Sequence, residues 1–137
     1  MTLVDTGPLV ALFDPQDSAH EDCAALLKKL SGPLYTTVPV LTEAFHMVEP
    51  GSRGADNLRE FVLRQGLLVW FLDGPAMRRT FSLMEKYRDH PMDLADGSLV
   101  TAAETLHTRK IFTLDRRDFL TYRVRIGRRH EKFQLVS

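Results

Sequence analysis

The sequence predicts an α/β domain with a central, mainly parallel sheet of four to five short strands flanked by helices. Short apolar runs alternate along the chain with segments whose apolar residues recur at helical spacing. Two of the apolar runs end in an acid, Asp5 and Asp115, and ligand sites of parallel sheets lie beyond such strand ends. A chain of 137 residues is long enough for one core, so we expect a single domain over residues 1–137.

The first half of the chain begins with a predicted strand over residues 2–5. Pro8 suits the first position of a helix, because that position needs no backbone N–H donor. Ser18 with Glu21 three residues later is the pattern of a capping box, which predicts a second helix from Ser18. The further elements expected here are a strand over 34–37 and helices over 39–48 and 54–65.

The second half opens on "LLVWFL", residues 67–72, which predicts a buried strand. The run is far shorter than the roughly 20 apolar residues that a membrane span needs. The further elements expected are helices over 75–88 and 94–107 and strands over 110–115 and 133–136.

Charge and cysteine content indicate which partners and which cellular compartment to expect for this protein. Net charge is zero, but residues 1–60 hold nine acids and four Lys or Arg, whereas 109–132 hold nine Lys or Arg and three acids. This basic region either contacts phosphates or is a solvated face. The lone Cys23 cannot form an internal disulfide, and the first residues lack the basic and apolar parts of an export signal. We therefore expect a cytoplasmic protein without a membrane segment.

Four acids occupy positions that parallel-sheet topology could bring together. Asp5 and Asp115 end strands, and Asp96 and Glu43 lie in early turns of predicted helices. The alternative is that each acid caps a helix or faces water, since Asp is favoured at helix N-caps. Spacing does not decide between these interpretations.

Helix geometry separates the two acids of "MDLADGSLV", residues 92–100. With about 100° per residue, Asp96 lies roughly 90° from the centre of the apolar stripe and Asp93 roughly 150°. Asp96 is thus expected to border the core and Asp93 to face out. We interpret Asp93 as a cap and Asp96 as a residue that lines a site.

Four sequence blocks together resemble those of a known family. They are "LVDTGPLVALF", "LTEAFHMV", "MDLADGSLVTAAE" and "IFTLDRRDF". In this order they resemble the motifs of PIN-domain ribonucleases, in particular the VapC toxins of VapBC toxin-antitoxin modules. The resemblance implies a PIN-like fold and an acidic catalytic and metal-binding quartet of Asp5, Glu43, Asp96 and Asp115, with the hydroxyls of Thr6 and Thr113 beside it.

The chain departs from the family pattern at a few positions. Gly97 follows Asp96 where these proteins often carry Ala, which should loosen the helix by up to about 1 kcal/mol. Asp93 and Asp118 are additional acids that could assist a member of the quartet, which makes Asp115 the less secure assignment.

The resemblance implies a Mg²⁺- or Mn²⁺-dependent endoribonuclease acting as a toxin. Hard divalent cations suit all-oxygen ligands and relieve the repulsion among carboxylates. The implied partners are an RNA substrate, a VapB-type antitoxin and a second copy in a homodimer. Arg116 and Arg117 follow Asp115 directly and are candidates for contacts with RNA phosphates.

Two alternatives stay open: a catalytically silent PIN-like module that binds RNA or protein, and a PIN nuclease for RNA processing. The sequence contains no P-loop, GxGxxG turn or GxSxG elbow, so the common nucleotide-binding and serine hydrolase classes are excluded.

Overall fold

A five-stranded parallel sheet forms the centre of the molecule, which confirms the predicted fold class. The computed structural model describes residues 1–136. The strand order is β3-β2-β1-β4-β7, and each neighbouring pair runs parallel. The strands are β1 (Thr2–Val4), β2 (Leu34–Thr37), β3 (Leu68–Trp70), β4 (Lys110–Phe112) and β7 (Gln134–Leu135).

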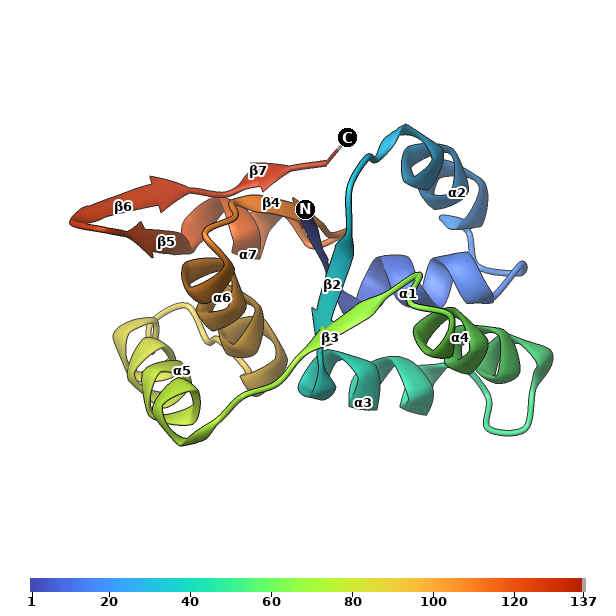
Figure 1. The fold of residues 1–137 in the computed structure, drawn as a ribbon, viewed down its shortest axis with the longest axis horizontal. Helices are drawn as coiled ribbons and strands as arrows, with labels where there is room; N and C mark the ends of the chain where they lie inside the picture. Colours follow the sequence, from blue (N-terminus) through green and yellow to red (C-terminus); the bar gives the residue numbers. More distant parts are fainter. Residues whose placement is uncertain (137) are drawn as a thin grey trace.

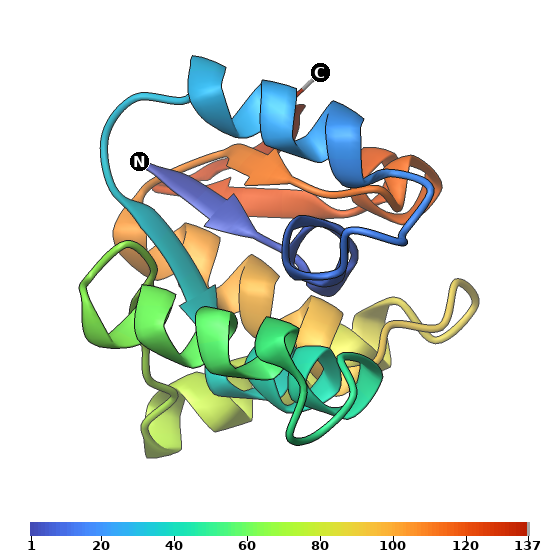
Figure 2. The ribbon, with the colours of Figure 1, turned by 90° about the vertical axis from the view of Figure 1, so that its right-hand side faces the viewer.

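The helices form two groups on either side of β2 and β3 (Figure 1). In one group α1 packs against α2, α3 and α4; in the other α6 packs against α5. Figure 2 shows α2 and α6 on opposite sides of the strands. The helices are α1 (Thr6–Phe13), α2 (His20–Lys29), α3 (Val38–Met47), α4 (Arg53–Leu63), α5 (Gly74–Lys86), α6 (Leu94–Leu106) and α7 (Arg116–Thr121).

Two predicted helix starts were wrong. The first helix begins at Thr6 rather than at Pro8, because the side chain of Asp5 accepts a hydrogen bond from the Thr6 amide and caps it earlier. The second helix begins at His20 without a side-chain cap, since Asp17 accepts the Ala19 amide at 2.9 Å. Both differences arise from an aspartate that bonds the local backbone.

The strand predicted over 67–72 is shorter and less buried than expected. Only Leu68–Trp70 pairs, at the edge of the sheet, and its three residues are half-buried. Phe71 is 70% exposed because the chain leaves the sheet there. An apolar run therefore identified the strand but not its position in the sheet.

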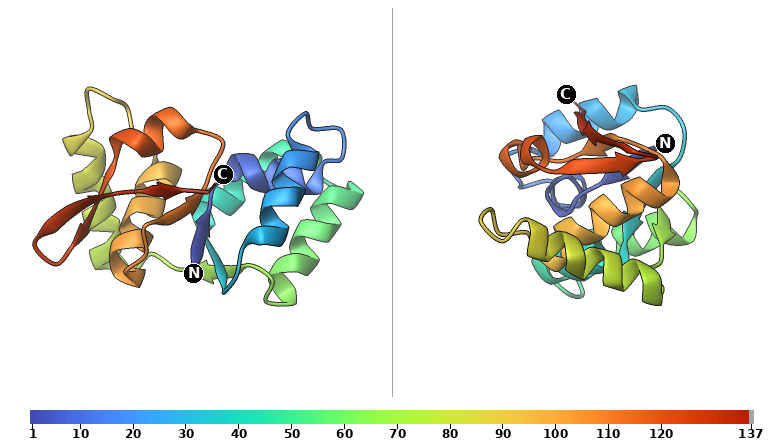
Figure 3. Two further views of the ribbon diagram at one scale, coloured as in Figure 1. Left: turned by 90° about the horizontal axis from the view of Figure 1, so that it is seen from above. Right: turned by 90° about the vertical axis from the view of Figure 1, so that its left-hand side faces the viewer.

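A basic hairpin near the C-terminus was missed altogether, as was α7. Strands β5 (Arg123–Ile126) and β6 (Arg129–Lys132) pair antiparallel around Gly127 and Arg128. Gly127 has a φ of +62°, which glycine adopts at little cost in a two-residue hairpin turn. The hairpin extends from the end of the molecule opposite to α2 and α4 (Figures 1 and 3).

The register of the central strands determines which residues lie next to one another at the carboxyl ends of these strands. Val4 of β1 lies opposite Phe112 of β4, so Asp5 and Thr113 leave adjacent strand ends together. Buried residues from β1, β4 and α6, such as Leu3, Ile111 and Leu99, hold this edge in place. Within residues 1–136, none of the helices has the length and apolar character needed to cross a membrane.

Candidate active site

A cavity of about 510 Å³ opens at the carboxyl edge of the sheet and is lined by six acids. They come from the ends of β1 and β4, from α3 and from the starts of α6 and α7, so segments far apart in the sequence meet here. All four acids of the predicted quartet are among them. The six are Asp5, Glu43, Asp93, Asp96, Asp115 and Asp118.

Asp5 is the most buried of these acids, with 7% of its surface exposed. One carboxylate oxygen accepts the Thr6 amide at 2.7 Å, and the other accepts the Thr113 hydroxyl at 2.8 Å. Burial raises the pKa of Asp5 to about 6 even though both hydrogen bonds favour the charged form, and the charges of Glu43 and Asp115 raise it further. The carboxylate is thus fixed in orientation but poorly solvated.

Asp93 and Asp96 occupy the different environments that helix geometry predicted. Asp93 is exposed and caps α6 by accepting the Asp96 amide at 2.8 Å. Asp96 is half-buried and faces the cavity. Burial, followed by the charges of Asp93 and Asp5, raises the pKa of Asp96 to about 8.

Glu43 reaches the cavity from the exposed side of α3. Its Oε1 accepts a hydrogen bond from the Thr6 hydroxyl at 3.2 Å, which connects α3 to the start of α1. Next to it, Ala44 and Val48 are buried in the core. Thr6 therefore contacts two acids, through its amide and its hydroxyl.

Asp115 and Asp118 form a pair at the start of α7. Asp115 caps that helix by accepting the Asp118 amide at 3.3 Å. A side-chain hydrogen bond between the two carboxyls raises the pKa of Asp115 and lowers that of Asp118. His90 adds to the effect on Asp118, because its Nε2 lies 2.5 Å from Asp118 Oδ1. Asp118 is therefore the member of the pair that keeps its charge to the lower pH.

Two residues at this site were missed by sequence reasoning, His90 and Tyr122. Tyr122 is fully buried, and its hydroxyl donates to Asp96 Oδ2 at 3.1 Å. Its ring packs edge-on against His90, Tyr87 and Phe119. A tyrosine and a histidine outside any motif carry no local signal of such contacts; only the density of aromatic residues after Asp118 hinted at a cluster.

Three predicted residues lie outside the cavity lining. Thr113 lies behind Asp5 as a hydrogen-bond donor and is buried. Arg116 and Arg117, the first two residues of α7, are exposed and directed to solvent rather than into the cavity. They therefore belong to the surface around the site.

The donor set fits a hydrated divalent cation better than a closed metal cage. Among residues 1–136, no three His, Cys, Asp or Glu side chains are close enough together to hold a metal ion. Mg²⁺ commonly takes only one or two carboxylates directly and keeps several waters, and the cavity has room for them. The raised pKa values of Asp5 and Asp96 indicate carboxylates whose charge would be stabilised by a nearby cation.

Comparison with known proteins gives one family and several similar structures. The model of the PIN domain family matches residues 2–124. Ribonuclease VapC26 of Mycobacterium tuberculosis (strain ATCC 25618 / H37Rv) is 27% identical over 125 residues, which cover 88% of this chain and 91% of that protein. The crystal structure of Mycobacterium tuberculosis VapC20, described as a Sarcin-Ricin loop cleaving toxin, superimposes with a TM-score of 0.74 at 15% identity, covering 81% of this chain and 87% of that one.

A further similar structure is VapBC2 from Rickettsia felis bound to a DNA fragment from their promoter. Its TM-score is 0.64 at 13% identity, covering 99% of this chain and 98% of that one. At such low identity the structural likenesses establish the fold alone.

Proposed function

Because the chain belongs to the PIN domain family, we propose that it is a Mg²⁺- or Mn²⁺-dependent endoribonuclease and the toxin of a type II toxin-antitoxin pair. The observation that carries this proposal is the convergence of Asp5, Glu43, Asp96 and Asp115 on one cavity. A module that only binds RNA or protein gains nothing from carboxylates whose pKa values are raised by burial, as those of Asp5 and Asp96 are, and raised further by the neighbouring acids.

In this proposal the carboxylates have different roles in metal binding, which follow from their different environments. Asp5 and Asp96, with raised pKa values, would hold the cation directly; Glu43 and Asp115 would act beside them or through water. The cation would supply an activated water and stabilise the leaving 3′ oxygen of the phosphodiester. Thr113 and Thr6 fix the orientation of Asp5, while the side chains of Asp93 and Asp115 cap the first turns of α6 and α7.

The substrate is RNA, and the rim of the cavity carries residues suited to its backbone. Arg116 and Arg117 are exposed at the start of α7, directly after Asp115. Arginine binds phosphate oxygens through two parallel N–H donors, so both side chains can contact phosphates that flank the scissile bond.

The proposed regulator is a VapB-type antitoxin, and the proposed assembly includes a homodimer of this chain. The similarity to a VapBC2 structure and to ribonuclease VapC26 supports this pairing. A basic antitoxin side chain entering a cavity lined by six acids would be attracted by their charge and would block access of RNA.

Metal-dependent cleavage tests the proposal. Purified protein should cut RNA with added Mg²⁺ or Mn²⁺, stop after chelation, and resume when metal returns, giving 5′-phosphate ends. Asp96→Asn should be folded and inactive under the same conditions, which controls for a contaminating nuclease. RNA cleavage that persists after thorough chelation contradicts the proposal.

A further inference from the structure

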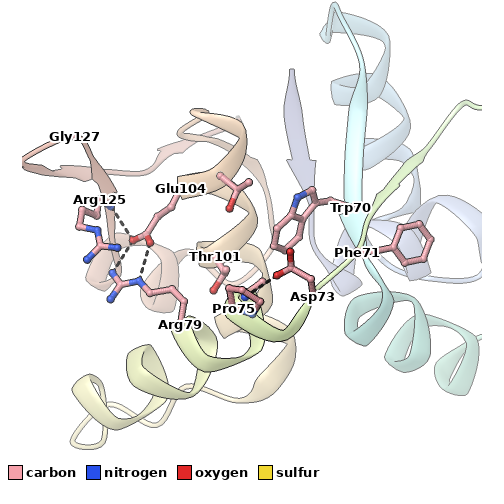
Figure 4. A pocket seen from close by; sticks show the side chains of 11 residues that line it. Trp70, Phe71, Asp73, Pro75, Arg79, Thr101, Glu104, Arg125 and Gly127 are labelled. Carbon is pink, nitrogen blue, oxygen red and sulfur yellow. Dashed lines mark hydrogen bonds and ion pairs between the residues drawn. The ribbon is translucent and has the colours of Figure 1, made fainter.

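We propose that a second cavity, remote from the acids, binds a nucleotide of single-stranded RNA and so extends the substrate site. This inference rests on the proposed ribonuclease function. The cavity measures about 470 Å³ and lies between the end of β3, the start of α5, the second half of α6 and the β5–β6 hairpin (Figure 4). Trp70, Arg79, Glu104 and Arg125 line it.

Glu104 of α6 fixes the walls of this cavity relative to one another. Its two carboxylate oxygens accept hydrogen bonds from Nε and Nη2 of Arg79 on α5, at 2.8 and 2.9 Å. Oε2 also accepts the backbone N–H of Arg125 on β5 at 3.0 Å (Figure 4). Both members of the ion pair are largely shielded from solvent, so the hairpin is held firmly against α5 and α6.

The hairpin supplies positive charge at this cavity. Residues 123–132 contain five Lys or Arg and one acid. The Arg123 side chain is engaged with backbone carbonyls of Leu120, Thr121 and Tyr122. Arg125, which lines the cavity, and Arg128, which follows the lining residue Gly127 in the hairpin turn, form no ion pair within residues 1–136 and are exposed. They are available to bind phosphate.

Trp70 supplies an aromatic surface in the same cavity that Arg125 lines (Figure 4). It is half-buried at the end of β3 and lines the cavity, whereas the ring of Phe71 points away from Arg79 and Glu104 (Figure 4). An aromatic ring beside cationic side chains is the combination that binds single-stranded nucleic acid, through base stacking and phosphate contacts. Trp70 is the only tryptophan of the chain, so its fluorescence reports on this cavity alone.

The two cavities share helix α6. Asp96 lies in its first turn and Glu104 eight residues later, which corresponds to about 12 Å along the helix axis. A single RNA strand bound at the acidic site can therefore reach the second cavity within a few nucleotides. The dimensions favour a nucleotide over a protein segment, because peptide recognition uses a longer apolar groove or an exposed strand edge.

Fluorescence titration in chelator tests the inference without any cleavage. Short single-stranded RNA should quench Trp70, and Trp70→Ala should weaken RNA binding, measured by anisotropy of labelled RNA, by at least about fivefold. The double change Arg125→Gln with Arg128→Gln should weaken binding and lower the slope of log affinity against log salt by up to about 1.4, or 0.7 per phosphate contact.

Two variants serve as matched controls. Lys28→Gln with Lys29→Gln removes two adjacent exposed charges from α2, at the opposite end of the molecule (Figure 1), and should leave binding unchanged. Phe81→Ala removes an exposed aromatic ring of α5 that does not line the cavity and should also bind RNA normally.

The outcomes separate this inference from the proposed function. Unquenched Trp70 at saturating RNA, or equal losses in the α2 control, overturns the nucleotide site even if the protein cleaves RNA. Quenching by polyglutamate as strong as by RNA also overturns it and assigns the cavity to an acidic protein. If RNA quenches Trp70 but is never cut with metal present, the nucleotide site stands and the nuclease proposal fails.

Discussion

The hydroxyl of Tyr122 donates a hydrogen bond to Oδ2 of Asp96 across 3.1 Å, and this bond connects the end of α7 to the first turn of α6. It is a hydrogen bond to the charged form of the carboxyl, so it opposes the rise in the pKa of Asp96 that burial causes. Tyr122 thus positions a proposed metal ligand from a fully buried location.

Replacing Tyr122 with Phe should weaken Mg²⁺ binding by roughly tenfold while preserving the fold. The ring still packs against its aromatic neighbours, but Asp96 loses a hydrogen bond of the kind that contributes about 1.5–3 kcal/mol when one partner is charged. Thermal stabilisation by titrated Mg²⁺ measures the affinity. Tyr87→Phe is the control, since the Tyr87 hydroxyl accepts the Arg123 amide and contacts no acid. Equal Mg²⁺ affinity of wild type and Tyr122→Phe would show that the bond is structural only.

The substitutions Asp96→Asn and Asp93→Asn should have different consequences. Asparagine still caps a helix, so Asp93→Asn should keep α6 intact and most of the activity. Asp96→Asn should fold but lose RNA cleavage and Mg²⁺-induced stabilisation, because an amide offers the cation no charge. Cleavage rates and thermal unfolding with and without Mg²⁺ measure both effects. Similar, mild losses in both variants would assign the two residues to helix capping.

The metal-free protein should become less stable as pH rises from about 4 to about 8, and its stability should level off above that. A carboxyl whose folded pKa is raised above its ordinary 3.8 contributes stability at low pH that is lost as pH rises through the folded value, here about 8 for Asp96. In chelator, Asp96→Asn should therefore gain in melting temperature relative to wild type across this range. Added Mg²⁺ should reduce the decline in the melting temperature of the wild-type protein. Parallel melting curves of the two proteins at every pH would contradict this prediction.

Changing Arg116 and Arg117 together to Gln should weaken RNA binding more than metal binding. Phosphate contacts release counterions, so the salt slope should fall by up to about 0.7 per lost contact with a single strand. Binding is measured in the Asp96→Asn background, so that no RNA is cut. Superimposable salt curves would place these exposed arginines outside the RNA path.

The substitution Gly97→Ala should destabilise the fold despite the better helix propensity of alanine. A Cβ at Gly97 would lie 2.9 Å from Cγ2 of Thr80, which is buried and whose hydroxyl is bonded to Ala76 and Thr101. Such overpacking costs about 1–3 kcal/mol, against a propensity gain of about 1 kcal/mol. Chemical denaturation should show the loss, while Gly74→Ala, where the nearest atom is 3.7 Å away, should change little.

Gly97 also shows where sequence reasoning reaches its limit. Helix periodicity correctly separated an exposed Asp93 from a half-buried Asp96, because both belong to one helix. The expectation that Gly97 merely loosens that helix considered α6 alone, whereas the glycine lets α5 approach it closely. Contacts between helices depend on tertiary packing, so they cannot be predicted from the apolar periodicity of one helix.

The same distinction applies to the site and to the hairpin. The positions of Asp5 and Asp115 at the ends of predicted strands indicated that the two segments lie close together. The structure shows why, because the parallel register places Val4 beside Phe112. Tyr122 and His90 reach the acids only through an aromatic cluster assembled by three segments. The hairpin was missed because only β5, RVRI, alternates charged and apolar residues, whereas its partner β6, RHEK, has no apolar residue and so gives no strand signal.

The acidic cavity is assembled from segments between residue 5 and residue 118, and β4, which precedes Asp115, pairs with β7 at residues 134–135. A ribosome that is still translating this message therefore carries a polypeptide whose cavity is unfinished. Under the proposed function, the nuclease therefore cannot act before the segment from residue 5 to residue 135 has been synthesised and folded.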